Sequence, residues 1–261
     1  MALAQAAAGT GTRGEALAGR RAVVTGGGTG IGAAVALALA RAGAEVAIAG
    51  RREEPLREAA RAHPRLRPAV CDAASPEDCA RVVAGADIVV ANAGAAMSKP
   101  FHRMEAADLR AMLDANLLTV FETFRAALPA MRERGAGRLV AIASTASLRG
   151  DAYVSGYAAA KHAVLGLVRS LAVEVAREGI TVNAVCPSYT ETPMLRRTVA
   201  TIVARTGRSE AEAEAPLLAR NPLGRFVRPE EVADAVLWLA GDGAAAVTGQ
   251  AISLSGGEVQ G

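Results

Sequence analysis

The fold is decided by one stretch, "RAVVTGGGTGIGAAVALALARAGAEVAIAG", at residues 21–50. Its first part, 21–26, is a short apolar run that ends in glycine, which is typical of a buried strand. An alanine-rich helical segment follows, and a second strand is predicted at 45–50. Because two parallel strands need a crossover between them, this stretch predicts one strand–helix–strand unit of a parallel sheet.

The same alternation continues along the rest of the chain. Further strands are predicted at 66–72, 87–94, 137–144, 180–187 and 250–257. Seven parallel strands covered by helices on both faces predict an α/β fold, with a single doubly wound domain at 19–261 after a flexible N-terminal tail at 1–18. Residues 188–228 break the alternation, and we expect this largely helical insertion to form a small substrate lid.

The composition favours a soluble globular protein. About half of the residues are hydrophobic (51%), the net charge is only +3, and few aromatic side chains are present to stack on bases, so no nucleic-acid partner is expected. No apolar run reaches the ~18 residues of a membrane span, and the N-terminus does not resemble a signal peptide. Three cysteines without metal-ligand spacing and three scattered histidines predict no metal site and a cytoplasmic location.

The loop "TGGGTGIG" at 25–32 lies directly between the first predicted strand and its helix. Gly26, Gly30 and Gly32 would allow a tight turn, a close approach of the backbone to a pyrophosphate, and close helix–strand packing. The helix N-terminus would then present free N–H groups to the anion. A lone glycine motif is weak evidence, but its place in the first strand–helix unit predicts dinucleotide binding.

The end of the second strand bears on which dinucleotide is bound. Folds that bind NAD usually place an acidic group here for the ribose 2′-hydroxyl, whereas this sequence has Gly50, Arg51 and Arg52. Arginine binds a phosphate bidentately, so NADP is favoured over NAD. The alternative is that the two arginines simply begin a solvated helix.

A second candidate site lies in "SGYAAAKHAVLG" at 155–166. Tyr157 and Lys161 are four residues apart, which places both side chains on one helix face, about 5–6 Å apart at Cβ. They are either two polar residues of an ordinary amphipathic helix or a proton donor beside the charge that tunes it. A Y-x-x-x-K match is common by chance, so the pair alone does not decide between these alternatives.

Taken together, the motifs resemble those of the short-chain dehydrogenases/reductases over almost the full chain, from about 19 to 257. The matching features are "TGGGTGIG", "ANAG" at 91–94, Tyr157-x-x-x-Lys161, Ser144 thirteen residues before the tyrosine, and Asn116 in "DANLLTVF". Several motifs in order at the family's spacing are far more specific than any one of them. The resemblance implies a Rossmann-type fold and a nicotinamide cofactor.

The resemblance also implies a catalytic tetrad of Asn116, Ser144, Tyr157 and Lys161. The Lys161 ammonium, with the positive nicotinamide, would lower the Tyr157 pKa from its usual ~10, so that Tyr157 acts as an acid in reduction and a base in oxidation. Ser144 would donate a hydrogen bond to the substrate oxygen, and Asn116 would hold a water in the proton relay and fix its helix.

By the same resemblance, the cofactor would contact many residues. These are Gly26, Thr29, Gly30, Ile31, Gly32, Arg51, Asp72, Asn92, Gly94, Tyr157, Lys161, Pro187, Thr190 and Thr192. Asp72 would accept a hydrogen bond from the adenine amino group, Asn92 and Gly94 would line the adenosine ribose, and Thr192 would bind the carboxamide.

Two positions depart from the family pattern. Ala91 replaces the first asparagine of N-N-A-G, and Ser188 replaces the glycine of P-G-x-x-x-T, which alters the turn at the pocket mouth. In the run "ASTAS", Thr145 or Ser147 could serve in place of Ser144, although the family's spacing favours Ser144.

The substrate is implied mainly by the C-terminal third, which is similar to 3-oxoacyl-thioester reductases, 3-hydroxybutyrate dehydrogenases and polyketide ketoreductases. The implied function is an NAD(P)-dependent oxidoreductase that transfers a hydride between nicotinamide and a secondary alcohol or ketone, here a 3-hydroxyacyl/3-oxoacyl thioester or a small β-hydroxy acid. A hydroxysteroid, polyol or xenobiotic alcohol is an alternative substrate, and a non-catalytic NADP-binding regulator is an alternative of another class. The arginines of the lid could meet an anionic substrate or face water.

The family usually forms tetramers. The alanine-rich outer faces of the predicted helices at 105–134 and 153–178 would permit close packing between copies. We therefore expect a homo-oligomer, a homotetramer by resemblance, with a small-molecule substrate as the other partner.

Overall fold

The computed structural model describes residues 16–260, which contain a seven-stranded, fully parallel sheet in the order β3-β2-β1-β4-β5-β6-β7. The strands are β1 Arg21–Thr25, β2 Glu45–Gly50, β3 Leu66–Val70, β4 Ile88–Ala91, β5 Gly137–Ile142, β6 Ile180–Pro187 and β7 Ala251–Leu254. The predicted α/β fold with seven parallel strands is therefore confirmed. Most of the expected tail, residues 1–15, lies outside the described residues, and Leu17 is buried and donates its amide to the Ala42 carbonyl (2.7 Å).

The helices connect the strands as the alternation predicts. They are α1 Gly30–Arg41, α2 Glu53–Ala60, α3 Pro76–Val83, α4 Ala106–Leu113, α5 Thr119–Arg134, α6 Ser155–Val175, α7 Pro193–Thr206, α8 Glu210–Leu218 and α9 Pro229–Ala240. Within the described part of the chain, no helix is both long and apolar enough to span a bilayer.

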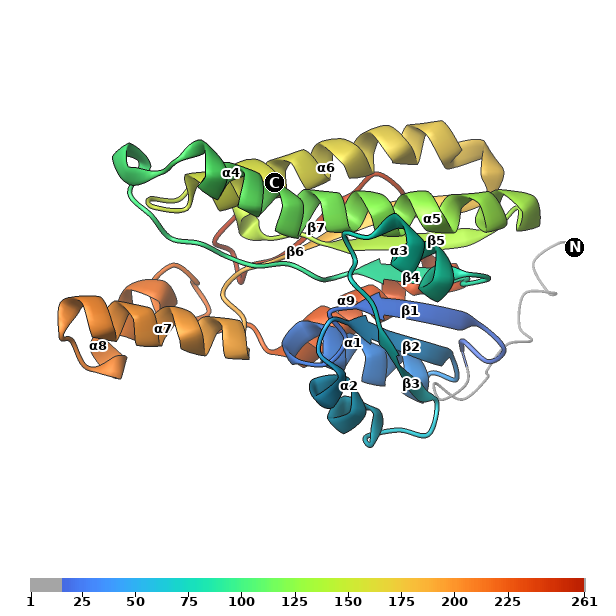
Figure 1. Cartoon of the computed structure of the whole chain (residues 1–261), viewed down its shortest axis with the longest axis horizontal. Helices are drawn as coiled ribbons and strands as arrows, with labels where there is room; N and C mark the ends of the chain where they lie inside the picture. The colour runs from blue at the N-terminus through green and yellow to red at the C-terminus, as the bar shows by residue number, and fades with distance from the viewer. Residues whose placement is uncertain (1–15, 261) are drawn as a thin grey trace, which may run out of the picture.

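Helices cover both faces of the sheet (Figure 1), and an apolar core lies between the sheet and each helix layer. Successive strand residues point to opposite faces, so Val24 joins the core beneath α1 and α9, whereas Val23 joins the core beneath α5 and α6. Full burial of such a side chain contributes about 1.5–3 kcal/mol. Packing on both faces therefore holds the carboxyl ends of the strands in place, and the site is built at those ends.

The helix predicted over 105–134 is interrupted by a π-helical turn at Asp114–Leu118, between α4 and α5. The Asn116 side chain is fully buried in this turn, where it donates to the carbonyl of Met112, one turn earlier (3.0 Å). A side chain that inserts into the helical hydrogen-bond ladder widens the turn, and such π turns are frequent at functional sites.

Residues 188–228 form α7 and α8, which extend from the body of the molecule at the left of Figure 1. A small apolar cluster of Leu195, Val199 and Ala213 joins the two helices, and Tyr189 packs against it. The hydroxyl of Thr192 caps α7 by accepting from the Leu195 amide (3.3 Å). The two helices thus form a small packed unit of their own, and we refer to residues 188–228 as the lid segment.

Candidate active site

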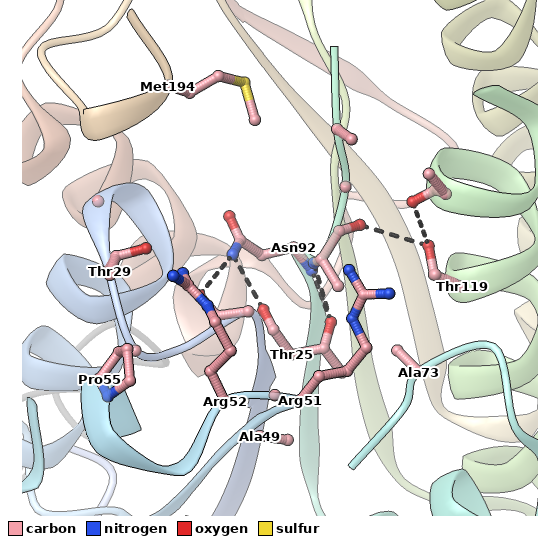
Figure 2. Close-up of a pocket in the computed structure, with 18 of the residues that line it drawn as sticks. Thr25, Thr29, Ala49, Arg51, Arg52, Pro55, Ala73, Asn92, Thr119 and Met194 are labelled. Atoms are coloured by element: carbon pink, nitrogen blue, oxygen red, sulfur yellow. Dashed lines mark hydrogen bonds between the residues drawn. The ribbon is translucent and has the colours of Figure 1, made fainter. Parts of the chain in front are cut away.

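A cavity of about 640 Å³ opens at the carboxyl ends of the strands, where β1 and β4 are neighbours. The chain leaves these two strands toward opposite faces of the sheet, and such switch points are where ligands bind in open α/β sheets. The cavity is lined by the loops that follow β1, β2, β3 and β4, and by the start of α7 (Figure 2). Its size lies in the range of small-molecule and cofactor pockets.

The glycine loop approaches the loop after β4 too closely for any side chain. Gly26 has a φ of +65°, and a Cβ there would lie 2.8 Å from Nδ2 of Asn92. That Nδ2 donates to the carbonyls of Thr25 (2.9 Å) and Gly26 (3.2 Å). A Cβ at Gly32 would collide with the Gly26 carbonyl oxygen. Gly30, at φ +54°, completes the turn into α1.

The N-terminus of α1 is open toward the cavity. Thr29, its N-cap residue, makes no side-chain cap hydrogen bond within the described chain, and the first turn contains no acidic residue. In contrast, Ser75 and Ser209 cap α3 and α8. The first amides of α1 are therefore left for an anion, and this loop fits the phosphates of a dinucleotide.

Arg51 and Arg52 both line the cavity, and Figure 2 shows their side chains rising from the end of β2 into the opening. Neither forms an ion pair with another residue in the described range, since the adjacent Glu53 pairs with Arg57 instead (2.6 Å). Asp72 lines the same cavity from the neighbouring strand. Two uncompensated guanidinium groups at this place fit an additional phosphate.

Most residues expected to contact the cofactor come together in this cavity. Its lining includes Gly26, Thr29, Gly30, Ile31, Arg51, Asp72, Asn92, Gly94 and Thr192. Among the described residues, Gly32, Tyr157, Lys161, Pro187 and Thr190 do not line it. Gly32 packs under the loop, Pro187 ends β6, and the Thr190 hydroxyl donates to the Ser188 carbonyl (2.9 Å).

Tyr157, Lys161 and Ser144 lie together beyond the end of β5. Ser144 follows β5 by two residues, and its hydroxyl accepts from the Ala146 amide (3.1 Å). Lys161 is 4% exposed, donates to the carbonyl of Ile142 (2.9 Å) and lies with Nζ 5.8 Å from the centre of the Tyr157 ring. The two side chains thus share one face of α6, as their spacing predicts.

Burial dominates the acid–base properties of this pair. It raises the pKa of Tyr157, an effect that the nearby Ser144 hydroxyl opposes, and it lowers the pKa of Lys161 to about 8. The expected lowering of the Tyr157 pKa is therefore not found in the protein alone, because both groups are desolvated. A bound nicotinamide in its positively charged form would add to the charge of Lys161 in lowering the Tyr157 pKa.

Asn116 fixes the loop after β4 against the π turn. Its Nδ2 donates to the carbonyls of Ala95 (2.9 Å) and Met112 (3.0 Å), and its Oδ1 accepts from the Ala95 amide (3.3 Å). A Cβ at Gly94 would lie 2.7 Å from that Oδ1. Both side-chain donors are thus used in protein contacts, and Gly94 is the residue that permits the approach.

An ion-pair network that the motifs did not predict joins the loop before α6, the lid and the C-terminal tail. Asp151 pairs with Arg149 (3.0 Å) and lies 2.5 Å from Nη1 of Arg220, a close charge contact without hydrogen-bond alignment. Arg149 also pairs with Glu258 (3.5 Å), whose buried carboxylate accepts from the Ser188 hydroxyl. No local pattern marks these residues, because they are distant in sequence.

Two tyrosines near this network also stand out. Tyr189 packs beneath the lid close to Tyr157, and burial raises its pKa. Tyr153 is 63% exposed and is, among the residues described, the one non-glycine residue with a positive φ (+68°). Such backbone strain is concentrated at functional sites.

Comparison with known proteins agrees with this geometry. The family model described as "Enoyl-(Acyl carrier protein) reductase" matches residues 26–258. The chain belongs to the short-chain dehydrogenase/reductase family. This short-chain dehydrogenase/reductase is an oxidoreductase that acts on CH–OH groups, in a family that uses a nicotinamide cofactor.

Its relatives act on different alcohols and ketones. It is 40% identical to cis-4-hydroxycyclohexanecarboxylate dehydrogenase of Sinomonas cyclohexanicum, over 94% of this chain and 98% of that protein. It is 37% identical to D-beta-hydroxybutyrate dehydrogenase of Rhizobium meliloti (strain 1021), over 66% of this chain and 67% of that protein. A crystal structure of a variant of actinorhodin polyketide ketoreductase with NADPH superposes with a TM-score of 0.87 at 38% identity, covering 92% of this chain and 97% of that one.

Proposed function

We propose that the protein reduces a 3-oxoacyl thioester, or oxidises the corresponding 3-hydroxyacyl compound, with NADP favoured over NAD. The observation that carries this proposal is the placement of Tyr157, Lys161 and Ser144 together beside a cavity whose glycine loop is open to a dinucleotide. The relative named as a D-beta-hydroxybutyrate dehydrogenase supports a substrate whose oxygen lies on the third carbon, and the neighbour named as a polyketide ketoreductase supports a ketone as the group reduced.

Tyr157 is the proposed acid and base. The bound nicotinamide supplies or accepts the hydride, and the Tyr157 hydroxyl gives its proton to the substrate oxygen in reduction and takes it back in oxidation. Ser144 donates to the same oxygen, where negative charge develops. Because its hydroxyl accepts from the Ala146 amide, its own proton is free to point at the substrate.

Lys161 supplies the charge that stabilises the phenolate form of Tyr157. Its hydrogen bond to the Ile142 carbonyl holds the ammonium beside the ring. With a pKa of about 8, the amine is mostly protonated at neutral pH and becomes neutral in mild alkali. Asn116, with its side chain tied to the loop after β4, acts in this proposal as the support of the site, and a relay water would be held by its main chain.

The preference for NADP rests on Arg51 and Arg52. Both are exposed at the end of β2, where the adenosine ribose is expected, and their charges are not paired by a carboxylate of the described residues. A 2′-phosphate would pair with them, whereas a bare 2′-hydroxyl would leave them unused. NADPH is the nucleotide crystallised with the actinorhodin ketoreductase variant.

The proposal is tested by the initial rate of acetoacetyl-CoA reduction, with NADPH and NADH compared at equal concentration. We expect turnover with NADPH preferred, and a loss of at least about 10³-fold in Tyr157→Phe with cofactor affinity retained. Preference for NADH would overturn the cofactor assignment alone. Full activity of Tyr157→Phe would overturn the mechanism. Cofactor binding without reduction of any tested ketone would support a non-catalytic regulator.

A cyclic secondary alcohol is the second candidate substrate. The match to cis-4-hydroxycyclohexanecarboxylate dehydrogenase extends over 98% of that protein, which favours a substrate with a hydrocarbon ring. Oxidation of cis-4-hydroxycyclohexanecarboxylate should then be faster than oxidation of 3-hydroxybutyryl-CoA under the same conditions. The reverse order would favour the thioester.

We also infer that the protein is a cytoplasmic homo-oligomer, with a homotetramer expected. An apolar groove of about 430 Å³ runs between α5 and α6, and it includes Leu117 and Phe121, which is 42% exposed. A second copy would cover this groove. Light scattering should give a multiple of 26.5 kDa, and Phe121→Glu should reduce that multiple. A wild-type monomer at micromolar concentration would contradict the inference.

A further inference from the structure

One arginine of the lid lines the cofactor cavity. Arg197, in α7, contributes to the lining together with Pro193 and Met194. Residues three and four apart lie on one face of a helix, so these three side chains share the face of α7 that is turned toward the cavity. The neighbouring Arg196 is exposed and is not part of the lining. The two arginines therefore form a natural pair, one facing the cavity and one facing away.

The start of α7 lies against the glycine loop. A Cβ at Gly30, the first residue of α1, would be 3.1 Å from the Thr192 side chain. Figure 2 shows Met194 across the opening from Arg51, on the side of the cavity where the glycine loop runs. The helix that carries Arg197 therefore begins beside the open amides of α1, where a pyrophosphate is bound in this fold, and Arg197 lines the cavity one turn farther along it.

The charge of Arg197 is available to a ligand. Its guanidinium forms no ion pair with a carboxylate of residues 16–260, in contrast to Arg220 of the same lid, which pairs with Asp151. The charged residues that line the cavity are three arginines and two aspartates, Arg51, Arg52, Arg197, Asp72 and Asp114. This excess of positive charge is complementary to a ligand that carries several phosphates.

We propose that Arg197 binds the pyrophosphate of the dinucleotide and thereby holds α7 over the bound cofactor. The inference rests on the dinucleotide site of the proposed function, and it does not depend on the thioester substrate. A guanidinium pairs with two phosphate oxygens at once, while the amides of α1 bind the pyrophosphate from the other side. Cofactor binding then sets the position of the lid before the substrate enters.

The test compares four proteins: wild type, Arg197→Gln, Arg196→Gln and Arg51→Gln. Dissociation constants for NADPH and NADH are measured from the fluorescence of the bound nicotinamide. Arg197→Gln removes a charge-assisted hydrogen bond. It should therefore raise the dissociation constants of NADPH and NADH by the same factor, on the order of tenfold or more. Arg51→Gln should weaken NADPH alone, and Arg196→Gln should weaken neither.

Fragments of the cofactor locate the contact. ADP-ribose contains the pyrophosphate, whereas adenosine 2′-monophosphate contains the 2′-phosphate only. In calorimetric titrations, Arg197→Gln should bind ADP-ribose more weakly and adenosine 2′-monophosphate as tightly as the wild type does. Arg51→Gln should bind adenosine 2′-monophosphate more weakly. Hydrogen–deuterium exchange gives a readout of the lid: NADPH should slow exchange in α7 of the wild type and Arg196→Gln, and not in Arg197→Gln.

Several results would overturn the proposal. One is an equal loss of cofactor affinity in Arg196→Gln and Arg197→Gln. Another is a loss of affinity for NADPH, but not for NADH, in Arg197→Gln. A third is unchanged cofactor affinity in Arg197→Gln together with a raised KM for substrate. The last result would make Arg197 a contact of the substrate. A wild type that binds NADPH but reduces no thioester contradicts the proposed substrate and leaves this inference intact. A wild type that binds neither dinucleotide overturns both.

Discussion

The two sides of the site are built by different physical means. On the cofactor side, the decisive contacts are those of the glycine-loop backbone with the loop after β4, as where the Asn92 side chain donates to the Gly26 carbonyl. On the side of α7 and α8, they are charge contacts between side chains from three separate segments, such as Asp151 with Arg220. Backbone crowding admits no side chain at all, whereas a charge contact can be weakened by degrees. We therefore expect substitutions on the cofactor side to cause large losses of stability and binding, and substitutions on the lid side to have smaller, graded effects.

The largest effect is expected from Gly32→Ala. The added methyl would collide with the backbone carbonyl oxygen of Gly26 and lie 2.5 Å from Nδ2 of Asn92, which could move away only by losing its hydrogen bonds to the Thr25 and Gly26 carbonyls. We expect a loss of about 3 kcal/mol or more in the free energy of unfolding, with loss of cofactor binding. Denaturant titration and NADPH fluorescence measure the two effects.

The matched control is Gly166→Ala in α6. A Cβ at Gly166 would meet no atom within 4 Å, and Gly166 is exposed within the helix. Alanine is the better helix former, so this variant should gain up to about 1 kcal/mol. If both variants lose the same stability, crowding at the glycine loop does not explain the sensitivity of the cofactor side to substitution.

This contrast explains what could be predicted from the sequence. Crowded backbone requires glycine, so Gly26, Gly30 and Gly32 appear in the sequence as a motif, and the alternation of strands and helices is equally local. The spacing of Tyr157 and Lys161 is helical, and the structure places both on one face of α6. Predictions of this kind need no knowledge of distant contacts.

The features that were not predicted depend on tertiary contacts. The π turn at Asp114–Leu118 arises because the buried Asn116 side chain bonds with Ala95 in the loop after β4, which the sequence between them does not signal. The raised pKa of Tyr157 comes from burial by several elements together. The pairing of Asp151 with Arg220 joins residues that are far apart in the chain and have no distinctive spacing.

The second prediction concerns Lys161, which lies between the two sides. Its pKa in the folded protein is about 8, below the usual 10.5, so the unfolded chain binds more protons between these pH values. This group therefore adds stability as the pH rises through that window, by up to about 3 kcal/mol. Lys161→Met has no group that titrates here, so its stability lacks this pH dependence. The free energy of unfolding of the variant relative to wild type should therefore be highest at pH 8 and below. The variant should also be inactive.

Urea titrations of both proteins at pH 7.5 and pH 10 measure this difference. The apolar packing of the lysine stem, which methionine largely retains, is common to both pH values, so the comparison reports the change in charge of Lys161 together with its hydrogen bond to the Ile142 carbonyl. A stability difference between variant and wild type that is the same at both pH values would show that burial does not perturb this lysine.

A smaller effect is expected from Asp151→Asn in the lid network. Loss of the carboxylate leaves Arg149 and Arg220 without their shared partner in a place where Asp151 is 12% exposed. We expect a loss of about 1–2 kcal/mol in stability, faster hydrogen–deuterium exchange in α8 and a raised substrate KM, with NADPH affinity unchanged. An equal loss of NADPH affinity would show that the two sides of the site are not separate.

The smallest effect is expected from Glu53→Gln, which removes the partner of Arg57 on the surface of α2. The two side chains are 56% and 61% exposed, and water already screens their attraction, so the loss of stability should be below about 0.5 kcal/mol. Denaturant titration beside Asp151→Asn makes the comparison direct, because each variant replaces one carboxylate by an amide of the same shape. If Glu53→Gln costs as much as Asp151→Asn, the lid network is an ordinary set of surface ion pairs. Only a clear excess for Asp151→Asn supports a network that positions the lid.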